Sequence, residues 1–226
     1  LGAKECAVDA IKKQISWIKD NKNTCRCVIM GDVLNAGVRD SPGAGPYDEN
    51  MDPQEQYELA LELFRPIKNQ IIGIHRGNHE DRIFNQTGID MIKNLCRELD
   101  VPYLGASCYH YIKFGPYNYT MYTTHGSGGA KFPYTKSKVA FDLGHAFDFD
   151  IVCVGHVHHI DVNTTAHRRL NSRSKTVEEY KKYFILTGSY LRYELSYAEA
   201  KNLFPSKVGC PKLKFFKDRK DIHASI

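Results

Sequence analysis

The amino-acid sequence predicts an α/β fold in which buried strands alternate with helices. Short apolar runs, typical of buried strands, alternate with longer segments whose apolar residues recur at helical spacing. Four of these runs end in glycine and polar residues, a pattern typical of a ligand site at the carboxyl ends of a mainly parallel sheet. No change in composition marks a linker, so we expect residues 1–226 to form a single domain.

The first half of the chain is expected to contain three helices and two buried strands. Val8, Ile11 and Ile15 lie three to four residues apart, which predicts an amphipathic helix over residues 4–20. Asp52 and Pro53 suit the N-cap and the first turn of a second helix. The remaining elements follow from their apolar residues. They are a strand over 25–30, a long loop over 35–51, a strand over 71–75 and a helix over 88–99.

The second half of the chain is expected to be richer in strands. Thr176 with Glu179, and Ser196 with Glu199, have the spacing of helix capping boxes. The basic residues just before the first box predict a loop that includes Arg168, Arg169, Arg173 and Lys175. The other expected elements are short β segments over 101–124, a helix near 137–147, buried strands over 150–154 and 183–187, and a basic edge strand within 205–226.

The composition excludes some classes of protein. With 42% hydrophobic residues the chain can form a substantial core, but no apolar run approaches the ~18 residues that cross a membrane. We therefore expect no membrane partner. The seven cysteines are odd in number and scattered, which predicts free thiols in a reducing, cytoplasmic compartment. The net charge of +5 is compatible with a phosphate-bearing substrate.

Polar residues with metal-ligand chemistry follow the four strand candidates. They are Asp32, Asn78 with His79, His125, and the pair His156 and His158. Because strand ends of this kind meet at one edge of an α/β sheet, we expect these side chains to converge. One carboxylate, one amide oxygen and several imidazoles favour a transition-metal site with mixed nitrogen and oxygen ligands. The chain lacks the cysteine patterns of a structural zinc site.

The order of these motifs resembles the calcineurin-like metallophosphoesterase superfamily. The resemblance rests on Gly31-Asp32, residues 77–80 (Gly-Asn-His-Glu), His125-Gly126 and residues 155–158 (Gly-His-Val-His), and it covers residues 31–158. It implies a four-layer sandwich of two mixed β-sheets, packed face to face and flanked by helices. It also implies two divalent metal ions at the strand ends. We expect Mn²⁺, although Fe, Ni²⁺ and Zn²⁺ also suit such ligands.

The resemblance assigns a role to each motif. It implies that Asp32 bridges both ions, that Asn78, His125 and His156 complete the second site, and that His158 binds the first ion. Members of the superfamily carry an Asp-x-His motif at the end of their first strand, whereas this chain begins Leu1-Gly2. We therefore expect the first strand and its two ligands to lie upstream of Leu1.

Other residues are candidates for catalysis or substrate binding. The resemblance implies that His79 protonates the leaving group, and the alternative is that His79 only donates a hydrogen bond near the metal. Arg82 is a candidate phosphate contact or a structural ion pair. Lys131, with Lys136 and Lys138, lies in or just after a glycine-rich loop after His125. These lysines are candidates for holding substrate phosphates, and the alternative is solvated surface charge.

Our leading hypothesis is a metal-dependent phosphoesterase that hydrolyses a phosphodiester or phosphomonoester by attack of a dimetal-bound hydroxide. Nucleic acid is one candidate substrate. The string over 76–80 (Arg-Gly-Asn-His-Glu) is close to that of the protein-phosphatase branch, so a protein phosphatase-like phosphomonoesterase is an alternative. The segment after Asp32 lacks that branch's Val-Asp-Arg-Gly, which favours the phosphodiesterase and nuclease side. The rival hypothesis is a non-catalytic metallophosphoesterase-like scaffold in an assembly. The sequence leaves the oligomeric state open.

Overall fold

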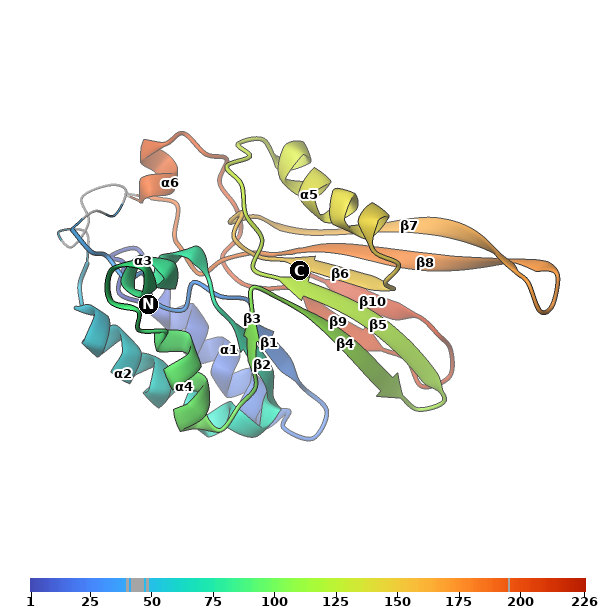
Figure 1. The fold of residues 1–226 in the computed structure, drawn as a ribbon, viewed down its shortest axis with the longest axis horizontal. Helices are drawn as coiled ribbons and strands as arrows, with labels where there is room; N and C mark the ends of the chain where they lie inside the picture. The colour runs from blue at the N-terminus through green and yellow to red at the C-terminus, as the bar shows by residue number, and fades with distance from the viewer. Residues whose placement is uncertain (40, 42–46, 48, 195) are drawn as a thin grey trace.

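The computed structural model describes residues 1–39, 41, 47, 49–194 and 196–226. Part of the loop expected over 35–51 therefore lies outside the described residues. The described part has the predicted α/β architecture, with mixed sheets and helices (Figure 1). The seven cysteines are all free, as expected. In the part of the chain that is described, no helix is long and apolar enough to cross a membrane.

The N-terminal half builds a parallel sheet covered by helices. The strands are β1 (Cys27–Ile29), β2 (Ile71–His75) and β3 (Tyr103–Gly105), in that order across the sheet. Helices α1, α2 and α4 pack with this sheet around one hydrophobic core, in which Ile74, Ile92 and Leu95 are fully buried. These helices are α1 (Val8–Asp20), α2 (Pro53–Phe64), followed by the 3₁₀ helix η2 (Arg65–Gln70), and α4 (Met91–Leu99).

The C-terminal half builds a larger, mixed sheet. Its strands are β4 (Ser107–Phe114), β5 (Tyr117–Thr124), β6 (Ile151–Val154), β8 (Thr176–Thr187) and β7 (Ile160–Asn171), in that spatial order. Strands β5, β6 and β8 are parallel, whereas the outer strands β4 and β7 are antiparallel to their neighbours. Figure 1 shows that β7 and β8 extend well beyond the other strands of this sheet.

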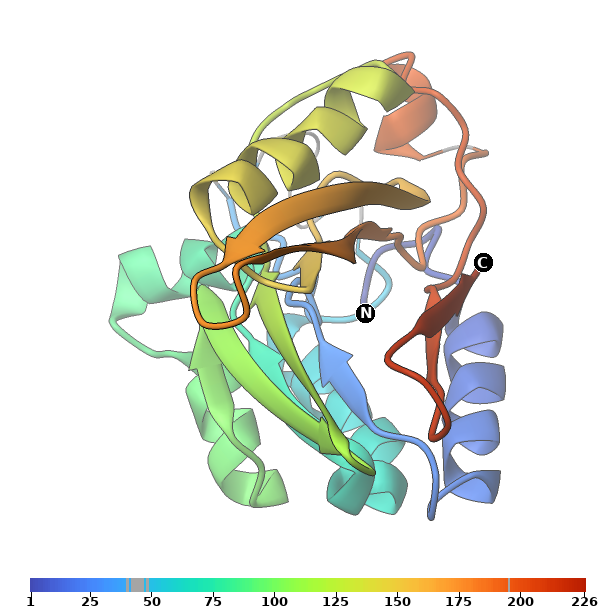
Figure 2. The ribbon, with the colours of Figure 1, turned by 90° about the vertical axis from the view of Figure 1, so that its right-hand side faces the viewer.

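Different elements cover the two faces of this mixed sheet. Helix α5 (Pro133–Ala146) packs on one face, where Ala140, Val152 and Phe184 are buried together. On the other face lie the antiparallel strands β9 (Lys212–Phe215) and β10 (Ile222–Ser225), together with Val28 of β1 and Met30 just after β1. Figure 2 shows α5 above the sheet and the β9–β10 pair beside α1.

A buried polar contact also joins the two sheets. The side chain of His75, at the end of β2, is fully buried. Its Nδ1 lies 3.0 Å from the carbonyl oxygen of Gly105, and its Nε2 lies 2.8 Å from the hydroxyl of Thr123 on β5. Because β2 and β5 belong to different sheets, this contact fixes one strand end relative to the other.

The helices after β2 differ from the expected ones. A helix, α3 (Asn78–Thr87), directly follows β2 and was not predicted, because its residues are mostly polar and carry the Gly-Asn-His-Glu motif. It ends at Gly88, whose φ of 74° is left-handed. The helix expected over 88–99 therefore begins only at Met91, with Asp90 as its N-cap.

The predicted capping box at Thr176 and Glu179 is wrong. Both residues lie in β8, where Thr176 pairs with Asn171 and Glu179 pairs with Arg168 across the hairpin. Arg168 and Arg169 likewise lie in β7 and not in a loop. Cross-strand ion pairs join Arg168 to Glu179, and Arg169 to Glu178. Long-range strand pairing overrides the local pattern here.

The second predicted box lies at a helix start. The short helix α6 (Tyr197–Ala200) begins directly after Ser196, whose hydroxyl oxygen accepts a hydrogen bond from the backbone N–H of Ala198.

Candidate metal centre

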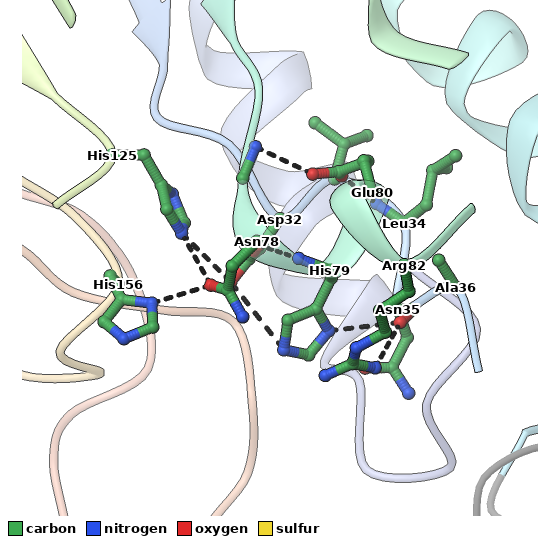
Figure 3. A network of polar contacts seen from close by, with 12 residues as sticks. Asp32, Leu34, Asn35, Ala36, Asn78, His79, Glu80, Arg82, His125 and His156 are labelled. Atoms are coloured by element: carbon green, nitrogen blue, oxygen red, sulfur yellow. Dashed lines mark hydrogen bonds and ion pairs between the residues drawn. The ribbon is translucent and has the colours of Figure 1, made fainter. Parts of the chain in front are cut away.

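Four of the predicted metal ligands meet at the carboxyl ends of the strands. Asp32 follows β1, Asn78 begins α3 after β2, His125 follows β5 and His156 lies two residues after β6. One ligand atom from each of Asp32, His125 and His156 lies within 4.8 Å of the others. The amide oxygen of Asn78 lies between the two imidazoles, as Figure 3 shows, 3.1 Å from His125 Nε2 and 2.8 Å from His156 Nδ1.

The backbone at this centre adopts a conformation that most side chains disfavour. Asp32, His156 and His158 have φ values of 50°, 63° and 48°, in the left-handed region. They are three of the seven non-glycine residues with positive φ in the described part of the chain. Such a conformation costs about 1–3 kcal/mol per residue and persists where surrounding packing enforces it. Strained backbone of this kind is typical of functional sites.

Glycine allows the loops after β1 and β2 to approach each other closely. A Cβ atom at Gly77 would lie 2.1 Å from Asp32 Oδ1 and 2.3 Å from the backbone nitrogen of Asp32. These separations are far below van der Waals contact, so any larger residue at position 77 would push the two loops apart. The carboxylate of Asp32 can therefore lie against the start of α3 only because position 77 is glycine.

Glu80 holds the same two loops together. One carboxylate oxygen accepts a hydrogen bond from the backbone N–H of Leu34 at 2.9 Å, and the other accepts from the backbone N–H of Gly77 at 2.8 Å. Burial raises the pKa of Glu80 to about 7, and the negative charge of Asp32 adds to this effect. We did not predict this positioning role from the sequence. The sequence signal for this role is capping-box spacing, because Glu80 lies three positions after Gly77, the residue that precedes α3.

Hydrogen bonds fix which imidazole nitrogen faces the centre. His125 Nδ1 lies 2.7 Å from the carbonyl oxygen of Met30, and His156 Nε2 lies 3.0 Å from that of Gly128. A carbonyl oxygen only accepts, so these nitrogens donate their protons to it. In the neutral rings, His125 Nε2 and His156 Nδ1 are then unprotonated. Both lone pairs face the amide oxygen of Asn78. Because three acceptor atoms repel one another at this distance, a cation or protons must lie among them.

The carboxylate of Asp32 adds a further acceptor. Its Oδ1 accepts a hydrogen bond from the backbone N–H of His79 at 3.0 Å. Its Oδ2 is buried and has no hydrogen-bond partner among the described residues, although His125 Nε2 lies only 3.4 Å away. If the Asn78 amide were turned, its NH₂ group would satisfy both imidazoles, but Oδ2 would still lack a donor. The residues present therefore fit a divalent cation.

The electrostatics of the centre favour a charged carboxylate. Burial raises the pKa of Asp32, but the proximity of His125 and of His79 outweighs burial and lowers the pKa below its usual range. Burial lowers the pKa of His125, whereas the partnership with Asp32 raises it, and the net pKa is raised. A proton on His125 and a metal ion thus compete for the same carboxylate.

His79 lies beside the four ligands. Its Nδ1 lies 3.1 Å from the carbonyl oxygen of Asn35, and its Nε2 lies 3.8 Å from Asp32 Oδ2. Burial lowers the pKa of His79, partly offset by the charge of Asp32. Arg82, one turn further along α3, donates from Nη1 to the same carbonyl of Asn35 at 3.0 Å. Both side chains therefore reach the loop that carries Asp32 (Figure 3).

The remaining predicted residues are placed less centrally. His158 is not one of the three clustered groups, but Asp32, His79 and His156 are near enough to affect its pKa, which burial lowers to about 4. Lys131 is exposed, and no contact in the described part of the chain joins it to the four ligands. Lys136, for which solvated charge was one alternative, is instead 2% exposed on α5. Because Lys136 is buried, it is not solvated surface charge.

The chain start lies near this centre. The N-terminal amino group of Leu1 donates a hydrogen bond to the carbonyl oxygen of Val33 at 2.5 Å. The backbone N–H of Asn35 donates to the carbonyl oxygen of Leu1 at 2.8 Å. These two hydrogen bonds hold Leu1 against the loop that carries Asp32.

Comparisons with known proteins give little further information. No family model matches the chain, and no curated protein matches it. A similar solved structure is a Vps29 double mutant from Entamoeba histolytica, which is 17% identical and covers 72% of this chain and 73% of its own. The TM-score is 0.35, which is too low to support an argument about fold or function. The function must therefore be argued from the site itself.

Proposed function

We propose that this chain is a metal-dependent phosphoesterase of the calcineurin-like metallophosphoesterase kind. The observation that carries the proposal is the set of acceptor atoms from Asp32, Asn78, His125 and His156, all directed at one point without a donor for Asp32 Oδ2. Mixed carboxylate, amide and imidazole ligands suit Mn²⁺, Fe, Ni²⁺ or Zn²⁺. We expect Mn²⁺ as the resident ion.

The proposal includes the arrangement of layers. Helices α1, α2 and α4 pack on the parallel sheet, α5 packs on the mixed sheet, and the His75–Thr123 contact joins the two sheets. These observations support a four-layer sandwich with the metal centre at one edge. In such a sandwich Asp32, with Asn78, His125 and His156, would hold a divalent ion, and His158 would lie beside them.

The residues of the centre would act on a phosphate ester in distinct ways. Bound divalent ions supply positive charge that orients the phosphate, stabilises charge on its oxygens and makes a water molecule more acidic. Asp32 holds that charge in place, and Glu80 holds the loop that carries Asp32. His79 donates its Nδ1 proton to the carbonyl of Asn35, so Nε2 faces the centre and delivers a proton to the leaving oxygen when the ring is in its imidazolium form.

Hydrolysis by the full chain with Mn²⁺ tests this proposal. Suitable substrates are p-nitrophenyl phosphate, bis-p-nitrophenyl phosphate and single-stranded DNA, which separate monoesterase, diesterase and nuclease activity. We expect turnover of at least one of them, and we expect Asp32→Asn to abolish it. Asp142→Asn is the control, since Asp142 is exposed on α5 and forms an ion pair with Lys138 on the same helix.

Two outcomes of this assay would count against catalysis. Absence of turnover in a protein with Mn²⁺ bound would contradict the phosphoesterase proposal and would favour the scaffold alternative. Equal turnover by the wild type and by Asp32→Asn would show that any activity arises outside this centre.

A further inference from the structure

A small cavity lies beside the candidate metal centre, on the side of His158. Its volume is about 20 Å³, and a water molecule needs roughly 10–15 Å³ measured in this way. The cavity therefore has room for one water molecule or for one oxygen atom of a larger ligand. It lies between the first turns of α5, the segment after β8 and the region of α6. Its lining residues include Lys136, His158, Ser189, Arg192, Phe204 and Ser206.

The lysine in this cavity lacks a counter-charge. Lys136 is 2% exposed, and its ammonium group makes no ion pair or hydrogen bond with the described part of the chain. Burial lowers its pKa, as expected for a desolvated amine. The described lining contains no Asp or Glu, and the other cation, Arg192, is paired with Asp9. A buried ammonium without a partner is costly, so an anion that enters this cavity would be stabilised.

Exposed aromatic rings flank the same cavity. Phe204 lines it, and the ring of Phe132 lies 5.6 Å from that of Phe204. The ring of Tyr134 stacks on Phe132, with centroids 5.6 Å apart and planes inclined by 14°. Tyr134 is 72% exposed, and Phe132 and Phe204 are each 44% exposed. This aromatic cluster offers ring faces on which a planar group can stack.

We propose that the Lys136 cavity and the aromatic cluster form a subsite for a nucleotide-like phosphate ester. Lys136 takes one non-bridging oxygen of the phosphate, and Phe132, Tyr134 and Phe204 stack against the base. The inference rests on the proposed function for the orientation of the ligand. His158 lines the cavity and lies near Asp32, so the phosphate end of the ligand is expected to face the metal centre. Binding itself does not depend on the metal, so it can be measured separately.

Binding of three probes to the full chain in EDTA tests the subsite. AMP carries both a base and a phosphate, ribose 5-phosphate lacks the base, and adenosine lacks the phosphate. Isothermal titration calorimetry should show that AMP binds more tightly than either fragment. Charge-assisted hydrogen bonds contribute about 1.5–3 kcal/mol, so Lys136→Met should weaken AMP binding about 10–100-fold. The control Lys93→Met, an exposed lysine on α4, should bind AMP normally.

A second pair of measurements separates the two parts of the subsite and does not depend on the Lys136 variant folding. Phe132→Ala should weaken binding of AMP but not of ribose 5-phosphate. AMP binding that is absent in the wild type, unchanged in a folded Lys136→Met, or unchanged in Phe132→Ala would overturn the inference.

The proposed function and this subsite can fail separately. Asp32→Asn should lose turnover but keep AMP binding in EDTA. If both the wild type and Asp32→Asn bound AMP but neither turned over a substrate, the subsite would stand and the phosphoesterase proposal would be contradicted. If Lys136→Met and Phe132→Ala hydrolysed AMP-like esters as well as the wild type does, the subsite alone would be contradicted.

Discussion

His125 Nε2 and Asp32 Oδ2 lie 3.4 Å apart, while Nδ1 of the same imidazole donates to the carbonyl of Met30. In the neutral ring this geometry places a nitrogen lone pair next to a carboxylate oxygen that has no other partner in the described part of the chain. The two groups repel each other unless a proton or a metal ion lies between them. The stability of the protein should therefore depend on metal.

Mn²⁺ should stabilise the wild-type protein against thermal unfolding. Ion at about 100 times its Kd adds about 2.7 kcal/mol to the free energy of unfolding if it binds only the folded chain. His156→Gln removes one ligand and should lose most of this gain. His223→Gln alters an exposed residue of β10 and should keep it. Differential scanning calorimetry with and without Mn²⁺ measures both, and an equal gain in the two variants would place the ion elsewhere.

Replacing His79 should separate catalysis from metal binding. His79→Gln keeps the four ligands, so Mn²⁺ affinity should stay close to that of the wild type. Turnover should fall roughly 10²–10⁴-fold, the usual contribution of a general acid. A matched loss of affinity and turnover would instead indicate that His79 only supports the ligands. The assay is steady-state hydrolysis beside calorimetric titration of Mn²⁺.

Enlarging the glycine between the two loops should disrupt the centre. Gly77→Ala places a Cβ atom 2.1 Å from Asp32 Oδ1, so the loops must separate. Overpacking of this kind typically costs about 1–3 kcal/mol, and Mn²⁺ affinity should fall with it. Gly129→Ala is the control, because its Cβ would meet nothing within 4 Å. Chemical denaturation gives the stability, and a Gly77→Ala protein as stable as Gly129→Ala would contradict the packing argument.

Stability should fall on mild acidification because of His75. Burial lowers the pKa of His75 to about 4 from 6.5, so the unfolded chain takes up a proton at higher pH than the folded chain does. The contribution of His75 is complete above pH 6.5 and is lost as the pH falls toward 4, by about 3 kcal/mol in total. His75→Gln cannot titrate, so its free energy of unfolding should depend less on pH in this window. Identical pH profiles for the two proteins would exclude His75 as the source.

The sequence predicted the strand ends well because the signal there is local. Apolar runs followed by glycine and a polar residue placed Asp32, His125 and His156 at one edge, and the structure brings them together. The resemblance added roles to these residues, but metal binding and catalysis stay predictions. The hydrogen bonds that set the histidine tautomers could not be predicted, because the carbonyl partners Met30 and Gly128 come from other segments.

Features that depend on distant contacts were missed. Helix α3 has few apolar residues, so its periodicity is weak, and its polar residues were assigned to function alone. Thr176 and Glu179 match a capping box locally, yet pairing with β7 places them in a strand. The burial of Lys136 depends on the segment after β8 and on α6, which lie about 50 to 70 residues further along the chain.

The most direct test of the central claim is the position of Mn²⁺ in crystals of the full chain grown with the ion. An anomalous difference map recorded near the manganese absorption edge locates it without assumptions about the ligands. We expect a peak within coordinating distance of Asp32 Oδ2, Asn78 Oδ1, His125 Nε2 and His156 Nδ1. Crystals that contain Mn²⁺ but show no peak among these four atoms would contradict it.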